Sequence, residues 1–196
     1  GNKIKVMDLV KRSFQHINGI SSKKEKLLWE EGVIDWQDAI DNIDYYAMPK
    51  SIKYILKKEL PKSIYNFNSK NYDYFIKNFP NKILYRLYPI LTNKTVFLDI
   101  ETTGLKPSAA DITVIGCYDG KDMKVFAHGI NEREFLDYIK DYSIIVTFNG
   151  SCFDIPFLEN YFETDIKCAQ IDLRFLLKDL GYSGGLKKIE HEVGLN

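Results

Sequence analysis

The strongest constraint on the fold is the segment 95–100, TVFLDI, a run of strand formers that is apolar on both faces. A strand without polar alternation is buried on both sides and belongs in the interior of a sheet. Two more strand patterns follow at 111–118 and 123–128. The pair Asp119-Gly120 between them favours a tight hairpin turn. We therefore expect a sheet that is built around the first of these strands.

Helix and strand patterns alternate after the hairpin, which favours a mixed α/β sheet flanked by helices. The expected helices cover 132–141, 156–162, 173–180 and 186–193, and the expected strands cover 143–148 and 169–172.

The residues before this sheet show helical patterns and predict a small all-helical domain. Helices are expected at 23–31, 35–40, 52–60 and 72–79, after near-helical apolar spacing from Ile4 to Phe14. Pro61 and Pro80 are expected to end the third and fourth helices, because proline lacks the backbone donor. Ser22 and Glu25 have the spacing of a capping box, and Gly32 is placed to end the same helix.

The sign of the net charge changes near Lys94, where the helical patterns end and the strand patterns begin. The net charge is zero, but residues 1–94 carry 17 basic and 10 acidic side chains, whereas residues 95–196 carry 10 and 17. We therefore expect two domains, 1–94 and 95–196. The stretch 46–94 combines ten basic side chains with ten aromatic ones. Such an asymmetry indicates contact with nucleic acid, although lysines on exposed helix faces and aromatics in a core are the common alternative.

Several functional classes lack support in the sequence. No window approaches the roughly 18 apolar residues of a membrane span, and no secretory leader opens the chain. The three cysteines lack close pairing, which fits a reducing compartment, so we expect a cytoplasmic protein without a membrane partner. No GxxxxGK[ST] or GxGxxG loop supports nucleotide or dinucleotide binding.

The first chemical motif is FLDIETTGL, residues 97–105. Asp99 and Glu101 are two residues apart on a strand and share a face. Two carboxylates at the end of an apolar strand repel each other, and Mg²⁺ or Mn²⁺ would relieve the repulsion. A solvated strand end is the alternative interpretation, but the apolar strand before the pair and Thr102 after it favour a metal site.

The second motif is TFNGSCFDIPFL, residues 147–158, in which an apolar strand ends at Asn149-Gly150. Asp154 precedes a helix that we expect to begin at Pro156, so one interpretation is a helix N-cap or a partner of the helix dipole. The other is a third carboxylate, brought from a neighbouring strand end to Asp99 and Glu101. Three such groups form a site for two metal ions that cleave phosphodiesters.

Together the two motifs resemble those of the DEDD 3′–5′ exonucleases, which have a ribonuclease-H-like fold. The chain is most similar to the YprB-type family through IGCYDG, IDLR at 171–174 and GGLKKIE at 184–190. The resemblance covers roughly residues 95–196. It implies a metal-dependent nuclease that hydrolyses phosphodiester bonds of DNA or RNA from a single-stranded 3′ end.

Carried over to this sequence, the resemblance makes Asp99, Glu101 and Asp154 the catalytic ligands of two Mg²⁺ or Mn²⁺ ions. Thr102 and Asn149 would lie near the substrate strand. The family's fourth carboxylate belongs to a third motif, which we expect beyond Asn196. Asp172 is a poor substitute, because its position in the family's pattern resembles a strand-to-helix turn. The alternative is an impaired or inactive nucleic-acid-binding module of the same fold.

A third motif, residues 16–36 (HINGISSKKEKLLWEEGVIDW), resembles a helix-hairpin-helix element. Gly19 matches that pattern, whereas Ser21 stands where a second glycine is expected. Backbone N–H groups at the start of the second helix would hold a phosphate, with Lys23 and Lys24 adding charge. An ordinary helical hairpin that packs on its neighbours is the alternative.

Overall fold

The computed structural model describes residues 8–104 and 112–194. The chain divides into two compact units, Gly1–Ile90 and Leu91–Asn196, whereas the sequence placed the boundary at Lys94. The predicted helical pattern before Asp8 and the predicted strand residue Asp111 lie outside the described residues. Within the described ranges, no helix has both the length and the apolar character that a membrane span requires.

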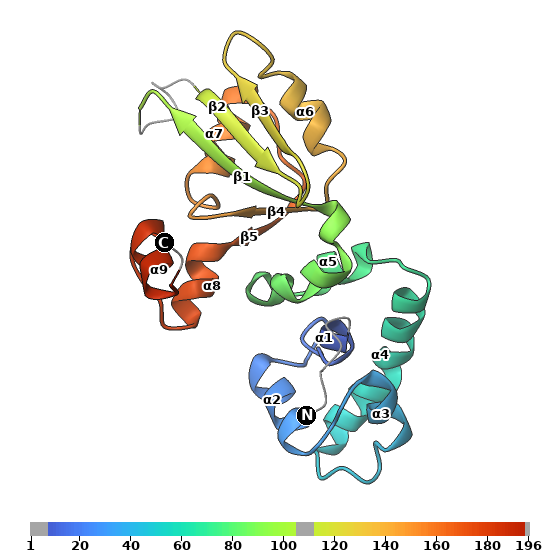
Figure 1. Ribbon diagram of the computed structural model, residues 1–196. Coiled ribbons are helices and arrows are strands. Elements are labelled where there is room, and N and C mark those ends of the chain that lie inside the picture. The colour runs from blue at the N-terminus through green and yellow to red at the C-terminus, as the bar shows by residue number, and fades with distance from the viewer. Residues whose placement is uncertain (1–7, 105–111, 195–196) are drawn as a thin grey trace. The chain divides into compact units, whose positions relative to one another are not determined.

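Unit 1, residues 1–90, is helical throughout its described part (Figure 1). Its helices are α1 (Asp8–Lys11), α2 (Ser22–Glu30), α3 (Trp36–Asp41), α4 (Lys50–Asn68) and α5 (Asp73–Asn78), and a 3-10 segment, η1 (Asn81–Ile90), follows. The sequence did not predict η1. The largest fully buried side chains of unit 1 form an aromatic and aliphatic core: Phe14, Leu28, Trp36, Leu56, Leu60, Phe75, Leu84 and Leu87.

The prediction that Pro61 ends a helix is wrong, because α4 continues through it to Asn68. Pro61 lies on the exposed side of α4, and the buried positions Leu56, Leu60 and Ser63 keep helical spacing across it. Packing of that buried side offsets the backbone hydrogen bond that proline removes.

The predicted cap of α2 is also wrong by one residue. Ser21 is the N-cap, and its side chain accepts a hydrogen bond from the backbone N–H of Lys24 at 3.3 Å. Glu25 does not reach back to the cap, because its carboxylate is buried. It accepts hydrogen bonds from the Phe14 backbone N–H at 2.7 Å and from the Arg86 guanidinium at 2.9 Å.

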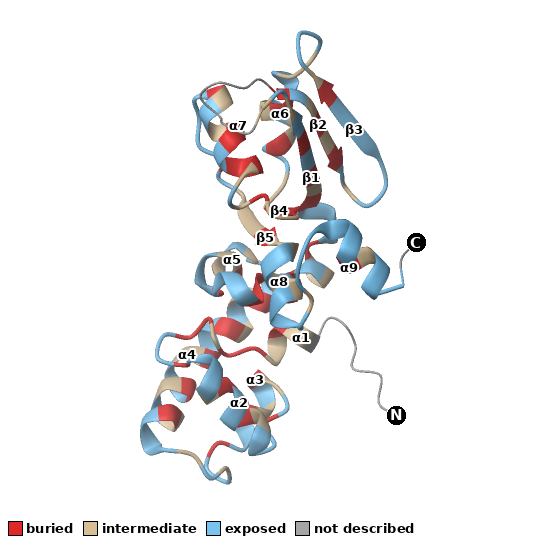
Figure 2. Ribbon diagram, turned by 90° about the vertical axis from the view of Figure 1, so that its left-hand side faces the viewer, coloured by how far each residue is buried: buried red, intermediate tan, exposed pale blue. Residues whose placement is uncertain are grey.

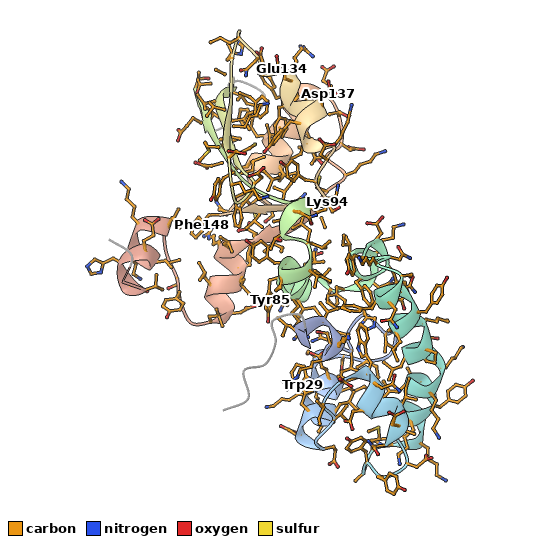
Figure 3. All side chains as sticks on the ribbon, turned by 45° about the vertical axis from the view of Figure 1, so that its right-hand side comes forward. Trp29, Tyr85, Lys94, Glu134, Asp137 and Phe148 are labelled. Carbon is orange, nitrogen blue, oxygen red and sulfur yellow. The ribbon has the colours of Figure 1, made fainter. Side chains whose placement is uncertain are left out.

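This buried ion pair is the polar centre of unit 1. Glu25 and Arg86 are 1% and 8% exposed. The guanidinium also donates to Ser13 Oγ at 3.1 Å and lies over the ring of Trp29 at 5.5 Å. Trp29, labelled in Figure 3, donates its indole N–H to the Arg12 backbone carbonyl at 2.9 Å. A fixed set of donors and acceptors therefore joins η1 to α2 and to the segment 12–14 that follows α1.

Unit 2, residues 91–196, opens with a short 3-10 turn, η2 (Thr92–Lys94), and contains a mixed five-stranded sheet. The strands are β1 (Thr95–Thr102), β2 (Ile112–Tyr118), β3 (Met123–Ala127), β4 (Ile144–Thr147) and β5 (Ala169–Asp172), in the order β3-β2-β1-β4-β5. β1 pairs antiparallel with β2 and parallel with β4, and β5 is parallel to β4. The prediction that the first strand lies inside the sheet is confirmed.

The helices of unit 2 are α6 (Glu134–Ile139), α7 (Asp154–Phe162), α8 (Leu173–Asp179) and α9 (Leu186–Glu192). Buried residues of α6 and α7 pack with Val96, Leu98 and Ile100 in one apolar core, so these helices lie against one face of the sheet (Figure 1). Glu134 and Asp137 of α6 are exposed on the opposite side of that helix (Figure 3). The predicted helices are all present, although α7 begins at Asp154 rather than at Pro156.

Candidate active site

The end of β1 presents the first two candidate carboxylates. Val96, Leu98 and Ile100 are buried in the core, and alternation along the strand directs Asp99 and Glu101 to the other face. Both acidic residues are exposed. Asp99 lies opposite Gly116 of β2, which has no side chain to crowd it.

The parallel strands bring three chain segments to the same edge of the sheet. β4 and β5 run in the direction of β1, so their carboxyl ends lie at the edge where Asp99 and Glu101 stand. The pairs between β1 and β4 end at Phe97 and Val146. Beyond that point β4 no longer lies beside β1, and the turn after β4 leads into α7.

Asp154 fills the place beside β1 that β4 leaves. It is the first residue of α7 and only 6% exposed, and its carboxylate accepts a hydrogen bond from the backbone N–H of Ile100. Its second oxygen, Oδ2, is buried and has no hydrogen-bond partner among the described residues. Phe153, not Asp154, is the N-cap of α7, so the N-cap interpretation is wrong, whereas the place of Asp154 in the first turn fits a partner of the helix dipole.

The electrostatics of Asp154 connect it to the β1 carboxylates. The pKa of the Asp154 carboxyl is raised to about 7, mainly by burial and then by the negative charge of Asp99. The hydrogen bond from Ile100 opposes this shift, and Asp172 and Glu101 add smaller repulsions. Keeping a buried carboxylate ionised beside other acids, with one oxygen unpaired, costs free energy unless a cation is bound.

The turn between β4 and α7 is held by Asp172, the last residue of β5. Its Oδ1 accepts from the backbone N–H groups of Asn149 and Arg174 at 2.7 and 3.0 Å. Its Oδ2 accepts from the N–H and the hydroxyl of Ser151 at 3.2 and 2.5 Å. All four acceptor positions of the carboxylate are therefore used within unit 2.

Asn149 and Gly150 give this turn its shape. Asn149 has a left-handed backbone (φ 62°), and its side-chain carbonyl accepts from the Arg174 guanidinium at 2.7 Å. Gly150 is buried, and a Cβ on it would overlap the side chain of Thr147. The Gly150 N–H donates to Thr147 Oγ1 at 3.1 Å, and its carbonyl accepts from the Ile155 N–H at 2.8 Å. These bonds place the start of α7, and with it Asp154.

The other predicted contact residues occupy two places. Thr102 ends β1 at the same edge and donates its hydroxyl to the Gly104 carbonyl at 2.7 Å. Gly19, Lys23 and Lys24 lie in unit 1, apart in sequence from these carboxylates. Gly19 has a left-handed backbone (φ 91°), Lys24 donates to the Gly19 carbonyl at 2.7 Å, and Lys23 is exposed.

Sequence reasoning missed the roles of Ser151 and Arg174, and it placed Asp172 at a strand-to-helix turn without predicting its hydrogen bonds. A signal was present, because Asp172 ends a short strand and directly precedes a helix, the position of an N-cap. Across the part of the chain that the structure describes, no group of three or more His, Cys, Asp and Glu side chains is arranged so that it could hold a metal ion.

A family model for the RNase_H superfamily matches residues 96–196, just over half of the chain. The chain belongs to the RNase_H superfamily. This confirms the predicted fold class of unit 2, a ribonuclease-H-like mixed sheet flanked by helices. A comparison with curated proteins finds no match.

Solved structures that resemble this RNase_H-superfamily chain match about half of it. They include the family B DNA polymerase of Pyrobaculum calidifontis, at 18% identity, a TM-score of 0.43, and coverage of 52% of this chain and 18% of that chain. Brucella melitensis NrnC with bound Mg²⁺ matches at 22% identity and a TM-score of 0.43, over 54% of this chain and 55% of that chain. The Aedes aegypti Nibbler EXO domain matches at 15% identity and a TM-score of 0.37, over 50% and 53%. The chain thus spans less than two thirds of each of these proteins.

Proposed function

We propose that unit 2 is a metal-dependent nuclease that hydrolyses phosphodiester bonds of DNA or RNA from a single-stranded 3′ end. The observation that carries the proposal is the carboxylate of Asp154. It is buried with one oxygen unpaired and lies beside a strand end whose Asp99 and Glu101 repel it. Membership of the RNase_H superfamily and the resemblance to YprB-type DEDD exonucleases support the same activity.

The type of donor fits a hard divalent cation, although the side chains are not arranged around a common point in the structure. Asp99, Glu101 and Asp154 offer only carboxylate oxygens, the ligand type that Mg²⁺ and Mn²⁺ prefer. Asp99 and Glu101 are exposed, so their rotamers are free to turn toward Asp154. Two such ions, when bound, activate water and stabilise the leaving oxygen of a phosphodiester.

The chain's own residues set the position of this site. Ile100 and the start of α7 fix Asp154 beside β1, and Asp172 fixes the turn that precedes it. The four accepted hydrogen bonds leave Asp172 without a free lone pair for a metal, so we assign it a positioning role. Thr102 and Asn149 lie at the same strand-end edge, where a substrate strand would pass the carboxylates.

The hairpin of unit 1 is a proposed second contact with nucleic acid. Gly19 turns the chain with a left-handed backbone, and Ser21 caps the helix that follows. Lys23 is exposed beside the first N–H groups of α2, where a phosphate would be attracted. Lys24 is less available for a phosphate, because its ammonium already donates to the Gly19 carbonyl.

The test is a cleavage assay on end-labelled single-stranded DNA and RNA, with Mg²⁺ or Mn²⁺ and with EDTA. We expect products that shorten from the 3′ end only when metal is present. Asp99→Ala and Asp154→Asn should each lower the rate at least about 100-fold, because each removes an oxygen ligand. Asp165→Asn, at an exposed position of unit 2, is the matched control and should leave the rate unchanged.

Two outcomes would overturn the nuclease proposal. One is cleavage that is the same in Asp99→Ala as in the unchanged protein. The other is salt-dependent, metal-independent binding of nucleic acid without any cleavage, which identifies the alternative, a binding module of the same fold.

A further inference from the structure

The long helix α4 of unit 1 has two sides of opposite character. Its buried side carries Ile52, Leu56, Leu60, Ser63 and Phe67. At about 100° per residue, the positions within about 40° of Tyr54 lie on the side away from this core. They include Lys50, Tyr54, Lys58, Pro61 and Tyr65, which we call the α4 outer stripe. All five are exposed, and exposed segments are visible on α4 in Figure 2.

Two tyrosines of this stripe are largely exposed to solvent. Tyr54 is 69% exposed and Tyr65 is 72% exposed. Within residues 8–104 and 112–194, neither ring stacks on another aromatic and neither hydroxyl has a hydrogen-bond partner. At 1.5 Å per residue, the two rings lie about 16 Å apart along the helix axis. Packing of unit 1 does not explain why these large side chains are aromatic.

The charge around the rings is strongly positive. The helix contains five lysines and one acid, Glu59. Lys57 pairs with Asp44 at 3.0 Å and Lys62 pairs with Glu59 at 3.1 Å. Among the residues that the structure describes, Lys50 and Lys58 have no ion-pair partner. Lys53 also lacks an ion pair among these residues, but it lies outside the stripe and donates to the Asp44 backbone carbonyl at 3.4 Å. Lys50 and Lys58 therefore place two such ammonium groups, without an ion-pair partner in the described chain, on the same stripe as the two exposed rings.

We propose that the α4 outer stripe binds single-stranded nucleic acid, with Tyr54 and Tyr65 stacking on unpaired bases and Lys50 and Lys58 neutralising phosphates. Free aromatic rings accept any base, and lysines between them follow the backbone. A duplex keeps its bases stacked inside, so it would contact only the lysines. This surface is in unit 1 and needs neither metal nor cleavage, so the proposal does not depend on the nuclease function.

The first experiment measures binding by fluorescence anisotropy in EDTA, with the full chain and three labelled probes. The probes are a thymidine oligonucleotide, an abasic oligonucleotide of the same length and a duplex of the same length. We expect the thymidine strand to bind at least about 25-fold more tightly than the abasic strand, because only the former offers bases that can stack on the two tyrosine rings. Equal affinity for the two strands would contradict stacking and would leave a general polyanion or an acidic protein surface as the ligand.

Substitutions locate the binding on α4. Tyr54→Ala combined with Tyr65→Ala should weaken thymidine binding by about 25-fold or more, whereas the same pair changed to Phe should keep the affinity. Lys58→Ala should reduce the slope of log affinity against log salt by about 0.7. Tyr45→Ala is the control, because Tyr45 is 87% exposed in the same unit and does not belong to the stripe.

Each variant changes an exposed side chain, and circular dichroism will verify that it is folded. Thymidine binding that is unaffected by the double Tyr→Ala change would overturn the proposal, as would an equal loss in the Tyr45→Ala control. If Lys23→Ala alone weakened binding of the thymidine strand, the nucleic-acid contact would belong to the hairpin of unit 1 instead. Because no probe is cleaved in EDTA, none of these results depends on the activity of unit 2.

Discussion

The hydroxyl of Ser151 donates a hydrogen bond of 2.5 Å to the carboxylate of Asp172. This bond joins the turn after β4 to the end of β5, although the two residues are 21 positions apart in the sequence. The same carboxylate accepts the backbone N–H groups of Asn149 and Ser151. The turn that leads to Asp154 is therefore supported by one acidic side chain that we do not assign to the metal.

Replacing Asp172 should therefore loosen the turn and lower activity together. In Asp172→Ala the N–H groups of Asn149 and Ser151 lose their acceptor and α8 loses its cap, so we expect unfolding to be easier by about 2–4 kcal/mol. Hydrogen exchange of residues 149–151 should become faster, which a change of metal ligation alone would not cause. Asp165→Ala is the control, and unchanged exchange in Asp172→Ala would refute the positioning role.

Asp154 should make stability depend on pH with a definite sign. Its folded pKa of about 7 lies above the ordinary value of 3.8, so the native state binds more protons between these values. Its contribution to stability is therefore present below about pH 4 and is lost as the pH rises through 7. Asp154→Asn cannot titrate and keeps an acceptor for Ile100, so it should gain stability over the unchanged protein as the pH rises.

Thermal melts from pH 4 to 8 in EDTA measure this difference, which should grow by at most about 1.4 kcal/mol per pH unit. Adding Mg²⁺ should reduce the stability difference between Asp154→Asn and the unchanged protein, because a cation stabilises the ionised carboxylate. Melting curves of the two proteins that keep a constant separation over this pH range would contradict the assigned environment of Asp154.

Gly150 should not tolerate any side chain. The Cβ of Gly150→Ala would overlap Thr147, whose hydroxyl already accepts the Gly150 N–H, so we expect a loss of about 1–3 kcal/mol and reduced nuclease activity. Gly185→Ala is the matched control, since a Cβ there meets nothing within 4 Å and the backbone has a negative φ. Equal melting temperatures for the two variants would show that the turn can relax.

Local sequence patterns predicted the sheet well, because β1, β2 and β4 are largely apolar runs and a turn signal separates β2 from β3. Asp99 and Glu101 could be paired from strand alternation alone, and Asp154 could be selected from its place after an apolar strand. The burial of Asp154 could not be predicted, since it depends on β4 ending before β1 does. The network around Asp172 joins residues more than 20 positions apart, and no local spacing reveals such contacts.

Unit 1 shows the same limit more clearly. The sequence predicted that Pro61 ends a helix, but α4 continues beyond Pro61 because Leu60 and Ser63 pack in the core of unit 1. The capping-box pattern of Glu25 is a local signal that a distant residue overrides. Arg86 is 61 positions away and takes the carboxylate into the core.

This buried pair should be strongly coupled. Arg86→Met leaves the Glu25 carboxylate buried without its cation, so we expect a loss of about 3–5 kcal/mol in the free energy of unfolding. Glu25→Gln should cost less, because the amide oxygen still accepts the Phe14 N–H. The double variant should cost less than the two single costs added together, by more than about 1 kcal/mol.

Denaturant unfolding of the four proteins measures this coupling. The control is the same cycle on Lys26 and Glu30, an ion pair of 3.7 Å whose side chains are 73% and 55% exposed. Water screens that pair, so its coupling should stay below about 0.5 kcal/mol. Additive costs at Glu25 and Arg86 would mean that the two groups do not share one buried charge network. Both cycles break a contact between a basic side chain and a glutamate in unit 1. The expected difference between their coupling energies therefore comes from the burial of the Glu25–Arg86 pair.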